Sequence, residues 1–351
     1  MIDLKSKKPL IISGPCSAET YEQTIQTAKA LAASGKVDIF RAGVWKPRTK
    51  PGGFEGVGIP ALPWLVDVKQ QTGLPVAIEV ANAKHVESAL AFGIDMFWIG
   101  ARTTSNPFSV QEIAEALRGT EVPVLVKNPM NADIELWCGA LERLAKCDIK
   151  NLGLIHRGFS GYGSKVYRNT PMWHFAIEIQ KRLPELPIFC DPSHICGNRE
   201  YLLDVAQQAA DLNFNGLMVE SHITPDEAWS DAKQQVTPEN LVQLLDSIVW
   251  RKEFSDSVAY QNALDELRGV IDRLDNEILR LLSMRMEVAE GIGFIKRQND
   301  VMILQPSRWN QIVERVLARS EELGLSEEFL NLIMEAIHIE SIKKQNRIMQ
   351  Q

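Results

Sequence analysis

Several side chains that could do chemistry stand at or just after short apolar stretches of the chain. Cys16 and Glu220 each end such a stretch, Glu79 is the last residue but one of another, and His194 follows a fourth by three residues. A thiol, an imidazole and carboxylates together suit a borderline divalent ion such as Mn, Fe, Co or Zn. Cys16 alone fits a small buried apolar residue equally well. The prediction of one divalent metal ion therefore rests on the combination.

A second set of side chains at these positions is cationic. Its members are Arg41, Lys46, Arg48, Arg102, Lys127 and Arg157. Like charges gathered at one place repel each other unless an anion compensates them, and phosphate and carboxylate groups suit guanidinium forks. Solvated ion pairs explain any one of these residues but poorly explain six. The set predicts anionic ligands.

Eight apolar stretches of strand length must position these side chains. They cover residues 10–16, 37–43, 75–80, 96–101, 123–128, 151–157, 187–191 and 216–220. Continuous apolar runs are typical of parallel strands buried on both faces, and the segments between them have helical apolar spacing. We therefore expect an α/β fold, a (β/α)8 TIM barrel over residues 1–250, with its chemistry at the carboxyl ends of the strands. The alternative is an open doubly wound sheet, but no GxGxxG follows any stretch.

The pattern changes at an expected linker, residues 251–258, after which no strand signal remains. From Leu264 to Ile295 apolar residues recur every three or four positions, which predicts one helix of roughly 35–40 residues. A second helix is expected after Pro306, and a third after Gly324 with Ser326 as its N-cap. Residues 259–351 are thus expected to be an all-α three-helix domain. Because a helix of about 55 Å cannot fold back within so small a domain, we expect a homodimer through it.

Composition excludes several classes of protein. The 351 residues include 38 Lys and Arg against 45 Asp and Glu, a net charge of −7, and 45% are apolar. This acidic balance argues against a nucleic-acid partner, and the apolar fraction argues against a largely disordered chain. Five cysteines spread along the chain suit reduced thiols, and no secretory signal or membrane span can be recognised. We expect a cytoplasmic protein that binds no membrane.

The segment RAGVWKPRT, residues 41–49, resembles the R-x(4)-K-P-R-T signature of DAHP synthase, the first enzyme of the shikimate pathway. GPCS at 14–17, GARTT at 100–104, DPSH at 191–194 and ESH at 220–222 resemble the family's other blocks in the same order. The resemblance spans nearly all of residues 1–250 and fits the compact type I beta subtype.

This resemblance implies that the barrel condenses phosphoenolpyruvate with erythrose 4-phosphate and releases phosphate. By motif position, the implied metal ligands are Cys16, His194, Glu220 and Asp231. Phosphoenolpyruvate would be held by Arg41, Lys46, Arg102, Lys127 and Arg157, and erythrose 4-phosphate by Lys46, Pro47, Arg48 and Thr49. The metal would act as a Lewis acid on the aldehyde oxygen, with Lys46 catalytic and Glu79 or a metal-bound water as the base. The related octulosonate 8-phosphate synthase carries Asn where Pro47 stands, which favours the four-carbon aldose here.

Helix geometry places a second candidate site in the helical domain. Arg285 and Lys296 are 11 residues apart, so they share a helix face about 16 Å apart and could converge on one small dianion. Arg268 lies about 25 Å further along the helix and could join them only from the other chain of an antiparallel dimer. On the pattern alone, a dimerisation module without a site is the alternative.

Residues from about 260 to 351 resemble the all-helical chorismate mutase family, through the stretch 267–275, the Arg285 and Lys296 spacing and the turn 306–308. The resemblance implies that Arg268 of the other subunit, Arg285 and Arg308 bind the substrate carboxylates, and that Lys296 and Gln345 donate to the ether oxygen. Gln305 stands where the family often has Asp, and Trp309 where it has a Glu that contacts the substrate hydroxyl. We expect conversion of chorismate to prephenate, weakened by these changes, or a sensing role.

The fusion itself suggests regulation. A domain that binds chorismate or prephenate, joined to the first enzyme of the same pathway, predicts feedback inhibition through two domain arrangements of different ligand affinity. The runner-up interpretation of the whole chain is an octulosonate 8-phosphate synthase-like barrel with a non-catalytic dimerising or sensing domain. The histidines expected to be structural are His85, His156, His174, His222 and His338.

Overall fold

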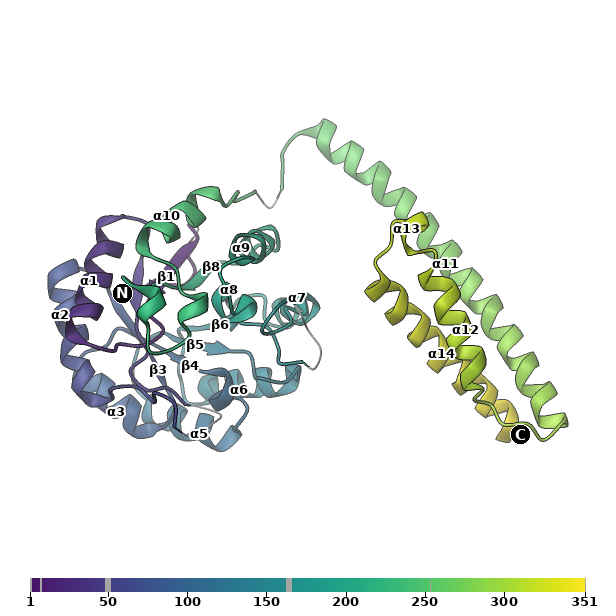
Figure 1. Cartoon of the computed structure of the whole chain (residues 1–351), viewed down its shortest axis with the longest axis horizontal. Coiled ribbons are helices and arrows are strands. Elements are labelled where there is room, and N and C mark those ends of the chain that lie inside the picture. The colour runs from purple at the N-terminus through teal and green to yellow at the C-terminus, as the bar shows by residue number, and fades with distance from the viewer. Residues whose placement is uncertain (1, 7, 48–51, 162–165, 253, 351) are drawn as a thin grey trace. The chain divides into compact units, whose positions relative to one another are not determined.

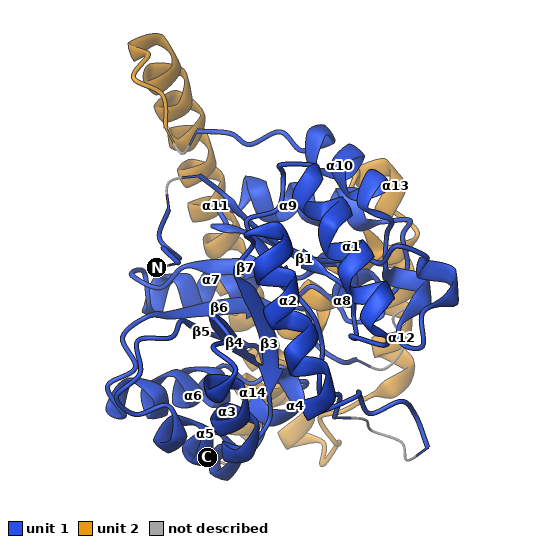
Figure 2. Cartoon of the chain, turned by 90° about the vertical axis from the view of Figure 1, so that its left-hand side faces the viewer, with its two compact units in different colours: residues 1–253 blue, residues 254–351 orange. Residues whose placement is uncertain are grey.

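The computed structural model describes residues 2–6, 8–47, 52–161, 166–252 and 254–350. The chain divides into two compact units, residues 1–253 and 254–351 (Figure 2). The division falls inside the linker expected at residues 251–258, and each unit is described by itself.

The first unit is a closed barrel of eight parallel strands in chain order, with β1 paired to β8 (Figure 1). The strands are β1 (Leu10–Gly14), β2 (Ile39–Arg41), β3 (Val76–Val80), β4 (Met96–Ile99), β5 (Val124–Lys127), β6 (Leu152–His156), β7 (Ile188–Cys190) and β8 (Gly216–Glu220). The predicted (β/α)8 barrel is confirmed. Most strands are shorter than the stretches that predicted them, because those stretches continue into buried loops: Cys16 and Ala42 are fully buried beyond the ends of β1 and β2.

Helices surround the barrel (Figure 1). The longer ones are α1 (Tyr21–Ala33), α2 (Leu62–Thr72), α3 (Ala83–Ala91), α5 (Pro107–Ala116), α6 (Ile134–Lys146), α7 (Trp173–Arg182), α9 (Leu202–Asp211) and α10 (Pro238–Ser247). Side-chain caps start several of them; Asp133, for example, accepts a hydrogen bond from the backbone N–H of Leu136 at the start of α6. Two short helices, α4 (Ala101–Thr104) and α8 (Pro192–Cys196), follow β4 and β7 directly and carry Arg102 and His194.

The barrel has two apolar layers because alternate strand residues point to opposite faces. On β3, Val76, Ile78 and Val80 belong to the layer between strands and helices, whereas Ala77 belongs to the barrel interior with Trp98 of β4. Each large apolar side chain buried in these layers contributes roughly 1.5–3 kcal/mol. The result is a rigid scaffold for the loops at the carboxyl ends of the strands.

The second unit is helical, with α11 (Val258–Gln298), α12 (Pro306–Leu317), α13 (Ser320–Leu323) and α14 (Glu327–Gln350). The predicted long helix spans 41 residues, and Ser326 Oγ accepts a hydrogen bond from the backbone N–H of Phe329 as expected of an N-cap. The four-residue helix α13 was not predicted. Helix α14 packs along α11, where a Cβ at Gly293 would lie 3.0 Å from Gln345 Cα. Among the described residues, no helix combines the length and apolarity needed to span a bilayer.

Candidate active sites

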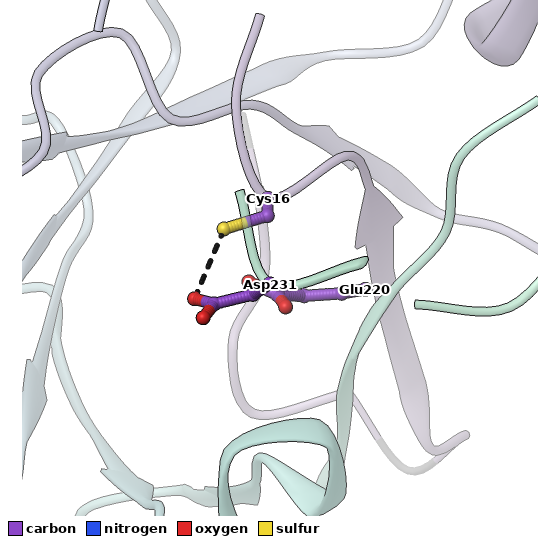
Figure 3. Close-up of side chains that lie close together, drawn as sticks. All are labelled: Cys16, Glu220 and Asp231. Carbon is purple, nitrogen blue, oxygen red and sulfur yellow. Dashed lines mark hydrogen bonds between the residues drawn. The ribbon is translucent and has the colours of Figure 1, made fainter. Parts of the chain in front are cut away.

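Three potential metal ligands meet at the carboxyl end of the barrel. Cys16 follows β1, Glu220 ends β8, and Asp231 immediately precedes the 3-10 helix η3 (Ala232–Gln234). One ligand atom from each lies within 4.8 Å of the other two. Figure 3 shows these side chains turned toward one another, with the Cys16 thiol donating to Asp231 Oδ2 at 3.4 Å. The structure thus brings together residues separated by more than 200 positions in the chain.

His194 lies beside this trio, slightly further from it than the three side chains lie from one another. Its Nδ1 is 2.8 Å from Asp191 Oδ2, and its Nε2 is 3.8 Å from Glu220 Oε1. Asp191 also caps α8 by accepting from the backbone N–H of His194, and its Oδ2 lies 2.6 Å from Lys127 Nζ. Burial alone would raise the pKa of Asp191, but His194 and Lys127 hold it well below its ordinary value. An ionised Asp191 therefore orients the imidazole with Nε2 toward the trio.

The chemistry of this donor set fits a divalent metal ion. Glu220 Oε1 is buried and accepts no hydrogen bond from any described residue, although Arg41 Nη1 lies 3.3 Å from it. Burial, followed by the charge of Glu220, raises the pKa of the Cys16 thiol to about 12. A bound cation would use the unbonded carboxylate oxygen and stabilise the thiolate. Sulfur, imidazole and carboxylate ligands suit Mn, Fe, Co or Zn.

Buried cations lie beside the same cluster. Arg41, Lys46, Lys127 and Arg157 are all at most 8% exposed. The guanidinium of Arg41 lies 4.7 Å from the ring centre of Trp98, and Lys46 Nζ is 3.0 Å from both the carbonyl oxygen and the sulfur of Cys16. Burial lowers the pKa of Arg157 to about 10, which still leaves it charged at neutral pH. A cluster of buried cations of this kind is suited to anionic ligands.

The other predicted barrel residues are more peripheral. Glu79 Oε2 accepts a hydrogen bond from Trp98 Nε1 at 3.1 Å, and a Cβ at Gly100 would lie 2.1 Å from Glu79 Oε1, so glycine makes room for this carboxylate. Arg102 is exposed on α4, and Pro47 follows Lys46 in a half-buried loop. Arg48 and Thr49 lie outside the described residues.

The helical unit contains a cavity of about 500 Å³, a size typical of small-molecule sites. Of the predicted residues, Arg285, Lys296, Gln305, Arg308 and Gln345 line it, as do Trp309 and His338, whose rings stack 4.1 Å apart. The described lining includes no Asp or Glu. The cavity is therefore suited to an anionic ligand.

Hydrogen bonds hold some of the side chains that line this cavity in place. Arg285 Nη1 donates to Ser341 Oγ at 2.7 Å, and Lys296 Nζ donates to the carbonyl oxygen of Ile303 at 2.5 Å. Gln345 is buried, and its Oε1 accepts no hydrogen bond from the described part of the chain. Arg268 is exposed, pairs with Asp265 three residues away and does not line the cavity.

Some residues of both sites were not found from the sequence. Ser341 and a fourth cation, Arg315, line the helical cavity. Ser341 lies on α14, and its position against Arg285 gave no signal without the packing. Arg315 follows Arg308 by seven residues on α12, a spacing that places both on one helix face and could have found it. In the barrel, Arg168 contacts Asp231, and Gln234 contacts Glu220. Arg168 lies in the loop between β6 and α7 and Gln234 ends the 3-10 helix η3, so neither stands at a strand end, where catalytic residues of a barrel are expected.

Comparisons with known proteins agree with the arrangement of the barrel. The model of the DAHP synthetase I family matches residues 3–255. Phospho-2-dehydro-3-deoxyheptonate aldolase of Thermotoga maritima is 31% identical over 248 residues, 71% of this chain and 70% of that protein. The chain belongs to the DAHP synthetase I family. The crystal structure of the Thermotoga maritima DAHP synthase has a TM-score of 0.63 at 30% identity, covering 70% of this chain and 71% of that one. A 2-dehydro-3-deoxyphosphooctonate aldolase of Magnetococcus marinus is 27% identical over 256 residues, 68% of this chain and 85% of that protein.

The helical unit matches a second family. The model of type II chorismate mutases covers residues 267–346. The chain therefore joins a DAHP synthase domain to a chorismate mutase domain, as the sequence predicted. These domains give it two enzyme activities of aromatic biosynthesis, a condensation that begins the shikimate pathway and the rearrangement of chorismate.

Proposed function

We propose that the DAHP synthase domain condenses phosphoenolpyruvate with erythrose 4-phosphate at one divalent metal ion, held by Cys16, His194, Glu220 and Asp231. The burial of four cations beside these groups carries the proposal. Buried charges are costly unless paired, and with the Cys16 thiol protonated, Asp191 and Glu220 are too few to balance Arg41, Lys46, Lys127 and Arg157. Adding Asp231 on one side and its partner Arg168 on the other leaves the cations in excess, and the phosphate and carboxylate of the substrates complete the balance.

The cations act by positioning. Arg41, Lys46, Lys127 and Arg157, with the more exposed Arg102, would bind phosphoenolpyruvate. Lys46, with Pro47, Arg48 and Thr49, would bind erythrose 4-phosphate. Holding two mutually repelling anions in contact lowers the entropic and electrostatic barrier to their reaction. Most of the rate acceleration is assigned to this step.

The remaining groups stabilise developing charge and transfer protons. When bound, the metal ion supplies Lewis-acid activation of the aldehyde. Lys46 is a donor at the edge of the trio, since its Nζ lies 3.0 Å from Cys16 Sγ. Glu79, fixed by Trp98 Nε1, takes the proton from the water that adds to the phosphoenolpyruvate carbon, after which phosphate leaves.

The four-carbon aldose is proposed because Pro47 follows Lys46. The competing substrate is arabinose 5-phosphate, since relatives of this chain include the 27%-identical 2-dehydro-3-deoxyphosphooctonate aldolase. Phosphoenolpyruvate consumption should be followed with each aldose in turn. Turnover with erythrose 4-phosphate supports the proposal, and turnover only with arabinose 5-phosphate overturns it in favour of the octulosonate 8-phosphate reaction.

For the second domain we propose that the cavity of the helical unit binds chorismate. Arg285 and Arg308 would meet its carboxylates, and Lys296 and Gln345 would donate to the ether oxygen as charge develops there. Replacing Lys296 with Ala should abolish chorismate turnover. Arg280→Ala is the matched control, because Arg280 is an exposed cation of α11 outside the lining. Equal loss in both variants, or loss in neither, would show that the cavity is not the site.

A homodimer through α11 would complete this site. The side chains of Leu267, Ile271, Leu274 and Ile278 recur at helical spacing and are each at least 50% exposed in the single chain. An apolar stripe of this length is expected to be covered by a second copy. In that dimer Arg268 of the partner would reach the cavity.

The domain would also regulate the barrel. We propose that prephenate or chorismate, bound in the helical cavity, inhibits the synthase by favouring one of two domain arrangements. Synthase rates of the full chain should fall with added prephenate, and Arg285→Met should remove that inhibition while leaving the uninhibited rate intact. Undiminished inhibition of the variant would place the effector site elsewhere.

A further inference from the structure

Arg168 reaches the metal-ligand trio from a different loop. It lies between β6 and α7, and its Nη1 donates to Asp231 Oδ1 at 3.0 Å and to Gln234 Oε1 at 2.8 Å. Because Oδ1 of Asp231 is engaged by Arg168, the other oxygen, Oδ2, is the one that faces Cys16 Sγ. One nitrogen of Arg168 thus determines which carboxylate oxygen points into the site.

Gln234 extends the same control to a second ligand. Its side-chain oxygen accepts from Arg168, so its amide nitrogen is directed the other way and donates to Glu220 Oε2 at 2.7 Å. That contact leaves Glu220 Oε1 as the oxygen near His194 Nε2, 3.8 Å away. Arg168 therefore orients Asp231 directly and Glu220 through one intermediate side chain.

The backbone that carries Arg168 is tied to the third ligand. The N–H groups of Arg168 and Asn169 donate to the carbonyl oxygens of Cys196 and Ile195, and Asn169 Nδ2 donates to the carbonyl oxygen of His194 at 2.7 Å. The stem of Arg168 passes over Gly197, where an added Cβ would lie 2.5 Å from Arg168 Cβ. Residues 168–169 thus connect the loop after β7, which carries His194, with the loop after β8, which carries Asp231, and hold these two ligands at a fixed separation.

The position of Asp231 makes this support necessary. Its backbone is left-handed, with φ 49° and ψ 35°, a conformation that residues other than glycine adopt infrequently. Its loop contains only the short 3-10 helices η2 (Pro225–Glu227) and η3 before α10. A carboxylate on such a loop keeps its direction only if other side chains hold it.

We propose that Arg168 is a positioning residue of the metal centre, which sets the direction of Asp231 and, through Gln234, of Glu220. The proposal rests on the metal-dependent function proposed above. Residues that orient metal ligands typically change metal affinity about 10- to 100-fold when removed. Arg168→Met keeps the apolar stem and removes both hydrogen bonds, so we expect a loss of this size.

The test measures metal binding to the metal-free full chain, without substrates. Co²⁺ is titrated against a competing chelator and followed by the thiolate-to-cobalt absorption of Cys16. We expect the dissociation constant to rise about 10- to 100-fold in Arg168→Met, by less in Gln234→Leu, and to be largely restored in Arg168→Lys, whose ammonium can also donate to two oxygens. Arg182→Met is the matched control, because Arg182 also forms ion pairs, but with the surface residues Glu135 and Glu178.

The outcomes separate this inference from the function on which it rests. If the unaltered chain binds no Co²⁺ through Cys16, the metal-dependent function fails. If the unaltered chain binds Co²⁺ and Arg168→Met binds it equally well, Arg168 is not a positioning residue. A raised KM for either substrate with unchanged metal affinity would also overturn the inference, since Arg168 would then contact substrate. Should Arg168→Met fail to fold, Gln234→Leu decides by the same titration.

Discussion

Metal binding to the barrel should depend on pH through Cys16. Burial and the neighbouring Glu220 raise the pKa of this thiol to about 12, so at pH 7 only about 10⁻⁵ of the metal-free protein carries a thiolate. Each ion bound as a thiolate complex must then displace one proton. Apparent affinity should rise about tenfold for each unit of pH between 7 and 10.

The other three proposed ligands add nothing to this dependence of metal affinity on pH. Burial lowers the pKa of His194 below its ordinary 6.5, so the imidazole is neutral throughout this range. Burial alone would raise the pKa values of Glu220 and Asp231, but His194 and nearby cations hold both below their ordinary values. Both carboxylates are therefore ionised. Of the four proposed ligands, only the thiol has a proton to lose.

The assay is a competition titration of Zn²⁺ at pH 7, 8 and 9, corrected for the protonation of the chelator, with calorimetry in buffers of different ionisation enthalpy to count released protons. One proton for each ion is expected. In Cys16→Ala affinity should fall and lose its pH dependence. An affinity of the unaltered chain that does not change with pH would refute the assignment of Cys16 as a ligand.

Three other perturbations probe packing and assembly. Lys127→Met should destabilise the barrel by about 3–5 kcal/mol in urea unfolding, because it strips a buried ion partner from Asp191; a loss below 1 kcal/mol would contradict this. Gly293→Val should cost about 1–3 kcal/mol and lower the thermal midpoint of the helical unit, since its side chain would collide with Gln345, and an unchanged midpoint would show that α11 and α14 do not pack there. Leu274→Glu should convert the expected dimer to monomer in sedimentation, whereas an unaltered chain that already sediments as a monomer would exclude the dimer.

The barrel and much of its site were predictable because they depend on local sequence. Eight apolar stretches predict eight buried strands, and in a barrel the carboxyl ends of all strands meet at one face. Cys16 and Glu220 could therefore be grouped although they are far apart in the chain. The exact ends of the strands could not be predicted, because buried loop residues such as Ala42 are as apolar as strand residues.

Residues whose direction depends on tertiary contacts were missed. Arg168 lies in the loop after β6 and Gln234 ends η3, and only the packing of these two segments against each other and against α8 turns both side chains toward the ligands. In the helical unit, the spacing of Arg285 and Lys296 on one helix predicted a shared site. Ser341 comes from α14, whose register against α11 no single-helix periodicity can give. Arg315 could have been found, because it follows Arg308 by seven residues on α12.

The central claim is that a cation-lined barrel mouth condenses two phosphorylated substrates with the help of a divalent ion. It is tested most directly by following the consumption of phosphoenolpyruvate with erythrose 4-phosphate before and after treatment with a chelator, and again after adding Mn²⁺ or Co²⁺. We predict that turnover stops with the chelator and returns with the metal ion. Full turnover in the chelated protein, with metal content verified as negligible, would contradict the claim.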